Sequence, residues 1–177
     1  MLDNMPKGDK WELVDNDKNS VKYKKSLKFD FYFIESDDIK KVVKAYVWRN
    51  YREKNKTLGY MLSNLSKFKK FNKFAILNEI FAFKELTNND IEMFISYLGT
   101  IISKQTKKPL SYNTQRSYLS SIKSIVRWGQ TYMPNEMPNK EIFTGNEFTG
   151  VNKNIKTDFI PDEIIEDINS ALKKEDN

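Results

Sequence analysis

The chain has 177 residues, of which 39% are hydrophobic and 14% aromatic, enough apolar material for one folded core or two small ones. No apolar run approaches the roughly 20 residues of a membrane-spanning helix, and the N-terminus lacks a signal-peptide stretch. The absence of Cys and His excludes a thiolate nucleophile, an imidazole base and a zinc site of the usual ligands. We therefore expect a cytoplasmic globular protein with no membrane partner, no metal and no cofactor.

The net charge is +6, and its distribution along the chain is more informative than its total. Two stretches, 54–78 and 94–135, contain no acidic residue and together carry +12, so the remaining residues carry −6. Coding DNA rich in A and T would enrich Lys throughout the chain, but it would not remove Asp and Glu from two blocks alone. The pattern predicts a basic surface on one part of the fold and an acidic surface on another.

The N-terminal part is expected to contain short strands and one helix. Aromatic residues alternate with polar ones over 28–34, as in a strand, and a hairpin turn is expected near 15–20. The alternating residues are Phe29, Phe31 and Phe33.

Four amphipathic helices are expected, because apolar residues recur at intervals of three and four. The expected ranges are about 36–54, 57–77, 87–103 and 111–134. Each begins at a residue that can cap the first turn, namely Ser36, Thr57, Thr87 and Ser111. The third has a capping box in which Asp90 replaces the usual Glu. Phe71 and Phe74 fall off the main stripe of the second and are expected to pack against a neighbouring element.

Beyond the fourth helix, scattered Pro, Gly and Asn residues predict an irregular linker. A last helix is expected to begin at Pro161, an acceptable first helical position. The expected organisation is an N-terminal extension, a helical domain, the linker and a final helical segment, at 1–56, 57–134, 135–158 and 159–177.

The polar side of the fourth expected helix carries only cations, hydroxyls and amides. Helical projection places seven of them on one arc opposite the apolar stripe: Asn113, Arg116, Ser117, Ser120, Lys123, Ser124 and Arg127. All of these groups donate hydrogen bonds to phosphate oxygens, and Arg and Asn also make bidentate contacts with purine edges. A merely solvated helix face would normally mix Glu with Lys. The pattern favours nucleic-acid contact over a solvated face.

Further cations flank this arc. The polar side of the second helix presents Ser63, Lys67, Lys70 and Lys73, although a solvated lysine face explains that pattern nearly as well. The loop before the fourth helix adds Lys104, Lys107 and Lys108. These lysines precede a helix N-terminus, where unpaired N–H groups attract anions, so we expect a phosphate to bind there. The phosphate is expected near Ser111 to Asn113, and Thr114 is also expected to contact DNA.

Two expectations concern aromatic residues near polar surfaces. Trp128 projects close to the polar arc, beside Arg127, and is expected to stack on a base or to bury against the linker or the last helix. Trp48 and Tyr51 define the contact site of an alternative function, a helical protein-interaction module whose basic face binds an acidic partner.

Four pieces of the sequence together resemble the N-terminal core-binding domain of tyrosine recombinases, the phage integrase family. In order they are TLGYMLSNLSKF at 57–68, LTNNDIEMFISYL at 86–98, SYNTQRSYLSSIKSIVRWG at 111–129 and DFIPDEIIEDINSAL at 158–172. The resemblance implies a mainly α, SAM-like bundle of four to six helices, here with a small β-hairpin at the N-terminus. It also implies that the domain holds double-stranded DNA at a recombination site, together with other recombinase protomers.

The resemblance also indicates what this chain would lack. Catalysis in the family requires an Arg, a Lys, a His-x-x-Arg motif, a further His or Trp and a nucleophilic Tyr, all in a second domain. The chain has no His, and none of its nine tyrosines is assigned the nucleophile role. We expect a non-catalytic, DNA-binding part of a larger enzyme from a phage or another mobile element.

Overall fold

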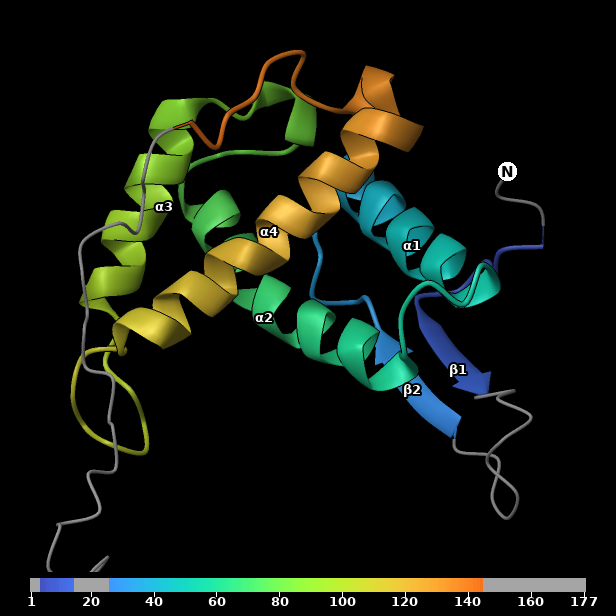
Figure 1. The fold of residues 1–177 in the computed structure, drawn as a ribbon, viewed down its shortest axis with the longest axis horizontal. Helices are drawn as coiled ribbons and strands as arrows, with labels where there is room; N and C mark the ends of the chain where they lie inside the picture. The colour runs from blue at the N-terminus through green and yellow to red at the C-terminus, as the bar shows by residue number, and fades with distance from the viewer. Residues whose placement is uncertain (1–3, 15–25, 145–177) are drawn as a thin grey trace, which may run out of the picture.

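The structure is a computed structural model that describes residues 4–14 and 26–144 and has a mainly helical fold (Figure 1). A two-stranded hairpin precedes four helices and two single 3-10 turns. The elements are β1 (Lys10–Val14), β2 (Ser26–Asp30), α1 (Asp37–Arg52), α2 (Leu58–Leu77), η1 (Phe83–Glu85), α3 (Asn88–Thr100), α4 (Tyr112–Tyr132) and η2 (Pro134–Glu136). Helix α4 runs diagonally across the centre of Figure 1 and packs against each of the other three helices.

The four helices begin at the expected capping residues, so this part of the sequence analysis is confirmed. The hydroxyls of Ser36, Thr57 and Ser111 each accept a hydrogen bond from the backbone N–H three residues later. Thr87 and Asp90 form a reciprocal capping box at the start of α3. Helix α3 ends at Thr100, three residues before its expected end, and the backbone is extended at Ile101.

The N-terminal strands pair in antiparallel register, with Trp11 opposite Phe29 and Leu13 opposite Leu27. Strand β2 ends at Asp30, earlier than the expected strand over 28–34. The reason is local, since the Asp30 carboxylate accepts a hydrogen bond of 2.9 Å from the N–H of Tyr32 and turns the chain. The hairpin turn expected near 15–20 and the last helix expected from Pro161 lie outside the described residues.

A cluster of phenylalanine rings joins α2, η1 and α3 at the centre of the core. Phe71 stacks on Phe83 at a centroid distance of 6.2 Å and meets the edge of Phe94 at 5.4 Å. Phe74 lies 5.3 Å from Phe94. The expectation that Phe71 and Phe74 pack against a neighbouring element is therefore confirmed. Because aromatic pairs at these distances add to the gain from burial, the cluster fixes the position of α3 on α2.

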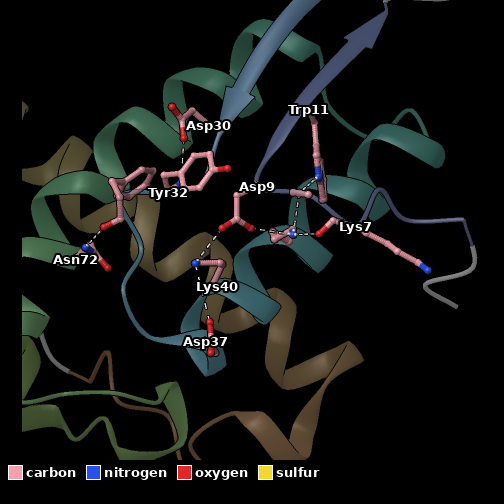
Figure 2. Close-up of polar contacts among 11 residues, drawn as sticks. Lys7, Asp9, Trp11, Asp30, Tyr32, Asp37, Lys40 and Asn72 are labelled. Atoms are coloured by element: carbon pink, nitrogen blue, oxygen red, sulfur yellow. Dashed lines mark hydrogen bonds and ion pairs between the residues drawn. The ribbon is translucent and has the colours of Figure 1, made fainter.

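An ion cluster ties the segment before β1 to α1 (Figure 2). The Lys44 side chain is almost buried, and its ammonium lies 3.2 Å from the Asp9 carboxylate and 3.0 Å from the Gly8 carbonyl oxygen. The Lys40 ammonium lies 3.1 Å from the other Asp9 oxygen. The hydrogen bond from Lys40 is the main reason that the pKa of Asp9 lies below its ordinary value.

The buried residues of the hairpin, the helices and the segment after η2 form one hydrophobic cluster. That segment is irregular, as expected for the linker, but its residues Met137, Ile142 and Phe143 are buried in the core. The division into four parts at residues 56, 134 and 158 stays a prediction.

Replacing Asp9 with Asn is expected to lower the free energy of unfolding by about 1–3 kcal/mol, because the buried Lys44 ammonium loses its charged partner. The carboxylate also makes stability depend on pH. Its contribution is complete above the ordinary pKa of Asp and is lost as the pH falls through the lowered value. Urea unfolding of the wild type and of Asp9→Asn across the acidic range measures both effects.

The matched control is Asp37→Asn. The Asp37 carboxylate is 3.9 Å from the Lys40 ammonium, but its side chain is 99% exposed, so its ion pair is screened by water. An equal loss of stability in the Asp9 and Asp37 variants would contradict the role assigned to Asp9.

Candidate nucleic-acid interface

An open groove of about 260 Å³ lies between α2 and the N-terminal half of α4. Two cations line it, Lys67 from α2 and Arg116 from α4, and the other lining groups are hydroxyls and amides. The complete lining is Tyr60, Asn64, Lys67, Asn113, Arg116, Ser117, Ser120 and Ser121. None of these residues is acidic, so every charged or polar side chain at the groove is able to donate a hydrogen bond.

A buried polar network forms the floor of this groove. Asn64 and Ser121 are 5% and 1% exposed, and Tyr46 of α1 is 4% exposed. The Asn64 side-chain nitrogen donates to the Tyr46 hydroxyl at 3.2 Å, and the Ser121 hydroxyl donates to the backbone carbonyl oxygen of Asn64 at 2.9 Å. Burial, with a smaller effect of the nearby Tyr60 phenol, raises the pKa of Tyr46 to about 12. The network joins α1, α2 and α4 at one point.

The structure brings only some of the predicted α2 residues to the groove. Lys67 is half-buried within it, whereas Ser63, Lys70 and Lys73 do not line it. Ser63 and Lys73 are exposed, and Lys70 is half-buried. Successive residues on a helix advance by about 100°, so these four side chains fan out across the polar side of α2. Lys67 is the one that faces α4.

The predicted α4 residues divide between the two halves of the helix. Asn113, Arg116, Ser117 and Ser120 reach the groove. Lys123 and Arg127 lie farther along, where a segment that we call the strap, residues 137–144, runs beside the helix. The Arg127 guanidinium lies 3.1 Å from the carboxylate of Glu141, and the Lys123 ammonium lies 5.4 Å from the centre of the Phe143 ring. The C-terminal half of the arc is therefore engaged within the protein.

The contacts of the strap determine the pKa of Glu141. Burial acts to raise the pKa of Glu141, but the N–H of Phe143 and the guanidinium of Arg127 outweigh it and hold that pKa below its ordinary value.

Gly129 of α4 allows the strap to approach, because an added Cβ would overlap the side chain of Met137. Gln130 donates to the carbonyl oxygens of Pro138 and Lys140.

The loop between α3 and α4 forms a small hairpin next to the N-terminus of α4, at the end of the helix farthest from the strap (Figure 1). Ile102 and Pro109 form an isolated antiparallel bridge, and the Ser103 N–H donates to the Lys108 carbonyl oxygen at 2.8 Å. The predicted cations of the loop are all exposed; they are Lys104, Lys107 and Lys108.

At the start of α4, the residues of the expected anion site make hydrogen bonds that cap the helix. The Ser111 hydroxyl accepts from the Thr114 N–H at 3.3 Å and lies 2.9 Å from the Thr114 hydroxyl. The first turn of α4 contains no acidic residue, and Asn113 is exposed at the mouth of the groove. Hydroxyls, backbone N–H groups and nearby lysines there provide donors for an anion.

The aromatic residues singled out in the sequence make contacts within the described part of the chain. The Trp128 ring meets the edge of Tyr46 of α1 at 5.5 Å and lies 5.5 Å from Tyr132. The expected last helix and residues 145–158 of the linker lie outside the described residues. Trp48 contacts Trp11 at 6.0 Å, and the Tyr51 hydroxyl donates to the carbonyl oxygen of Val14. Trp48 and Tyr51 thus hold the hairpin on α1, which weakens the case for them as a partner-binding site.

Three residues of the groove were not predicted as site residues: Tyr60, Asn64 and Ser121. Tyr60 and Asn64 precede Lys67 by seven and three residues, so the helical spacing that places Lys67 would also have placed them beside it. Ser121 follows Ser117 by four residues in the same way.

Within residues 4–14 and 26–144, no acidic cluster suited to a metal ion is present and no helix has the length and apolarity to cross a membrane.

Replacing Tyr46 with Phe is expected to lower the free energy of unfolding by about 1–3 kcal/mol, because the buried Asn64 amide loses its acceptor. Urea unfolding measures this change. The control is Tyr32→Phe, which removes a hydroxyl from a ring that is 64% exposed and should change stability by less than about 0.5 kcal/mol. Equal effects of the two substitutions would contradict a structural role for the network.

Comparison with known proteins shows the family of the chain. No curated protein and no solved structure matches the chain. The family model of the phage integrase SAM-like domain matches residues 38–132, which run from the first turn of α1 to the end of α4 and so include both walls of the groove. This domain is the non-catalytic part of integrases. Because the match covers more than half of the chain, the protein belongs to the phage integrase SAM-like domain family.

Proposed function

We propose that this protein is the core-binding domain of a site-specific tyrosine recombinase and that it holds double-stranded DNA through the α2–α4 groove. In this role the domain positions the recombination site during DNA integration or recombination, while a separate catalytic domain and other recombinase protomers complete the reaction. The observation that carries the proposal is the acid-free groove with Lys67 on one wall and Arg116 on the other.

Phosphate contacts account for the first part of the interaction. Cations that neutralise backbone phosphates release condensed counterions and supply most of the affinity for DNA of any sequence. Lys67 and Arg116 serve this purpose in the groove, and the exposed lysines of the loop extend the positive surface beyond the start of α4. Ser117 and Ser120 add hydroxyl donors for phosphate oxygens.

Base contacts account for any sequence preference. Arg116 and Asn113 are the groove residues whose side chains can pair with purine edges in the major groove. Two such contacts give limited discrimination, because each good bidentate pair contributes about 1–3 kcal/mol. The domain alone should therefore bind DNA with modest specificity, and further contacts would come from the rest of the enzyme.

The alternative function, a protein-interaction module that binds an acidic partner, has less support. Its expected contact residues, Trp48 and Tyr51, pack against the hairpin. A nuclease-resistant complex between the protein and an acidic protein would favour this alternative.

Substituting Lys67 or Arg116 with Gln is expected to weaken binding to a labelled mixed-sequence duplex. If about six cations meet phosphates, log K falls with log salt at a slope of roughly −5, and each lost contact reduces the magnitude of that slope by about one. Fluorescence anisotropy titrations at several salt concentrations measure both affinity and slope.

Lys28→Gln is the matched control for the loss of one positive charge. Lys28 is exposed on β2 and does not line the groove, so its removal should leave the slope unchanged. The proposal fails if Lys67→Gln and Arg116→Gln bind DNA with the affinity and slope of the wild type.

A further inference from the structure

The strap brings an acidic side chain to the face of α4 that otherwise carries cations, hydroxyls and amides. Residues 94–135 contain no Asp or Glu, yet the Glu141 carboxylate lies 3.1 Å from the Arg127 guanidinium. The charge of Lys123 acts on the same carboxylate. One acidic group therefore compensates the two cations at the C-terminal half of the predicted DNA-binding arc.

Two kinds of interaction hold the strap, and the ion pair is the weaker one. Ile142 and Phe143 are each 4% exposed, so both side chains are anchored in the core. Asn88 of α3 donates to the carbonyl oxygen of Ile142 at 2.9 Å and to the Thr144 hydroxyl at 3.0 Å. The side chains of Arg127 and Glu141 are 53% and 44% exposed, and ion pairs with that exposure contribute little to stability. The pair can open while the strap stays in place.

Arg127 occupies a position from which it could otherwise meet the same DNA as Arg116. The two residues are eleven positions apart on α4, which is three helical turns and places both on one side of the helix. A duplex that follows this side would meet the Glu141 carboxylate next to Arg127, and a carboxylate repels phosphate. Contact between phosphate and Arg127 therefore requires the guanidinium to exchange one anionic partner for another.

We infer that Glu141 withholds Arg127 from DNA and so sets the C-terminal limit of the DNA-binding surface. This inference rests on the proposed function. In the wild type the duplex is held by the groove and the lysine loop, and Arg127 remains paired within the protein. Loss of the Glu141 charge extends the surface by one phosphate contact.

The decisive substitution is Glu141→Gln, because it removes the charge with little other change. The Oε1 atom of Glu141 accepts the N–H of Phe143 at 2.9 Å, and the amide oxygen of Gln can accept the same bond. We expect this variant of the 177-residue chain to bind a labelled mixed-sequence duplex several-fold more tightly at low salt. The slope of log K against log salt should become steeper by about 0.9, the value for one additional phosphate contact.

Two controls separate this effect from a general loss of negative charge. Glu92→Gln removes the charge of an exposed carboxylate on α3 and should give a smaller gain with no change of slope. Arg127→Gln should leave the wild-type slope unchanged, and it should abolish the gain when it is combined with Glu141→Gln. Such non-additivity is expected only if the two residues are coupled.

Four results would overturn the inference. They are no gain in Glu141→Gln, equal gains in Glu141→Gln and Glu92→Gln, a gain of Glu141→Gln that persists without Arg127, and a slope that falls by about one in Arg127→Gln alone. The proposed function is tested separately by Arg116→Gln. If Arg116→Gln binds DNA weakly and Glu141→Gln shows no gain, the proposed DNA-binding role of the groove is supported. Only the inference that Glu141 withholds Arg127 from DNA is then wrong.

Discussion

The arrangement of the helices depends on a buried amide, Asn64, which connects α2 to α1 and to α4. Its side chain donates to the Tyr46 hydroxyl on α1, and its backbone carbonyl oxygen accepts from the Ser121 hydroxyl on α4. Buried polar groups are costly without partners, so other placements of α4 that leave these groups unpaired are disfavoured. Apolar packing alone would allow α4 to slide or rotate on α2, whereas this network selects one position.

The network also determines which side chains meet at the surface above it. Because α4 is held close to α2 at Ser121, Lys67 and Arg116 end up on opposite walls of one groove. The Asp9 carboxylate does not line the groove. It pairs with the ammonium groups of Lys40 and Lys44 on α1, near the hairpin. No acidic residue lines the groove, which presents the positive charges of Lys67 and Arg116.

Much of this fold could be predicted because helix caps and apolar stripes are local signals. Ser36, Thr57, Thr87 and Ser111 mark the helix starts without any knowledge of the neighbouring elements. Lys67 and Arg116 were predicted as site residues for the same reason. Helical projection shows which side of a helix is polar, but it does not show what lies over that side. The pairing of Arg127 with Glu141 and the packing of Trp128 on Tyr46 depend on elements distant in sequence or free of periodicity.

Gly129 has a consequence for how the two ends of α4 differ. Glycine within a helix costs about 1 kcal/mol relative to alanine, and at this position the absent side chain makes room for Met137. The N-terminal end of α4 is capped by Ser111, whereas the last turns contain the glycine and are supported by the strap through Met137 and Gln130. Among the backbone amides that are hydrogen-bonded within α4, exchange should therefore be fastest in those last turns. Local opening would begin there and leave the groove end of the helix protected.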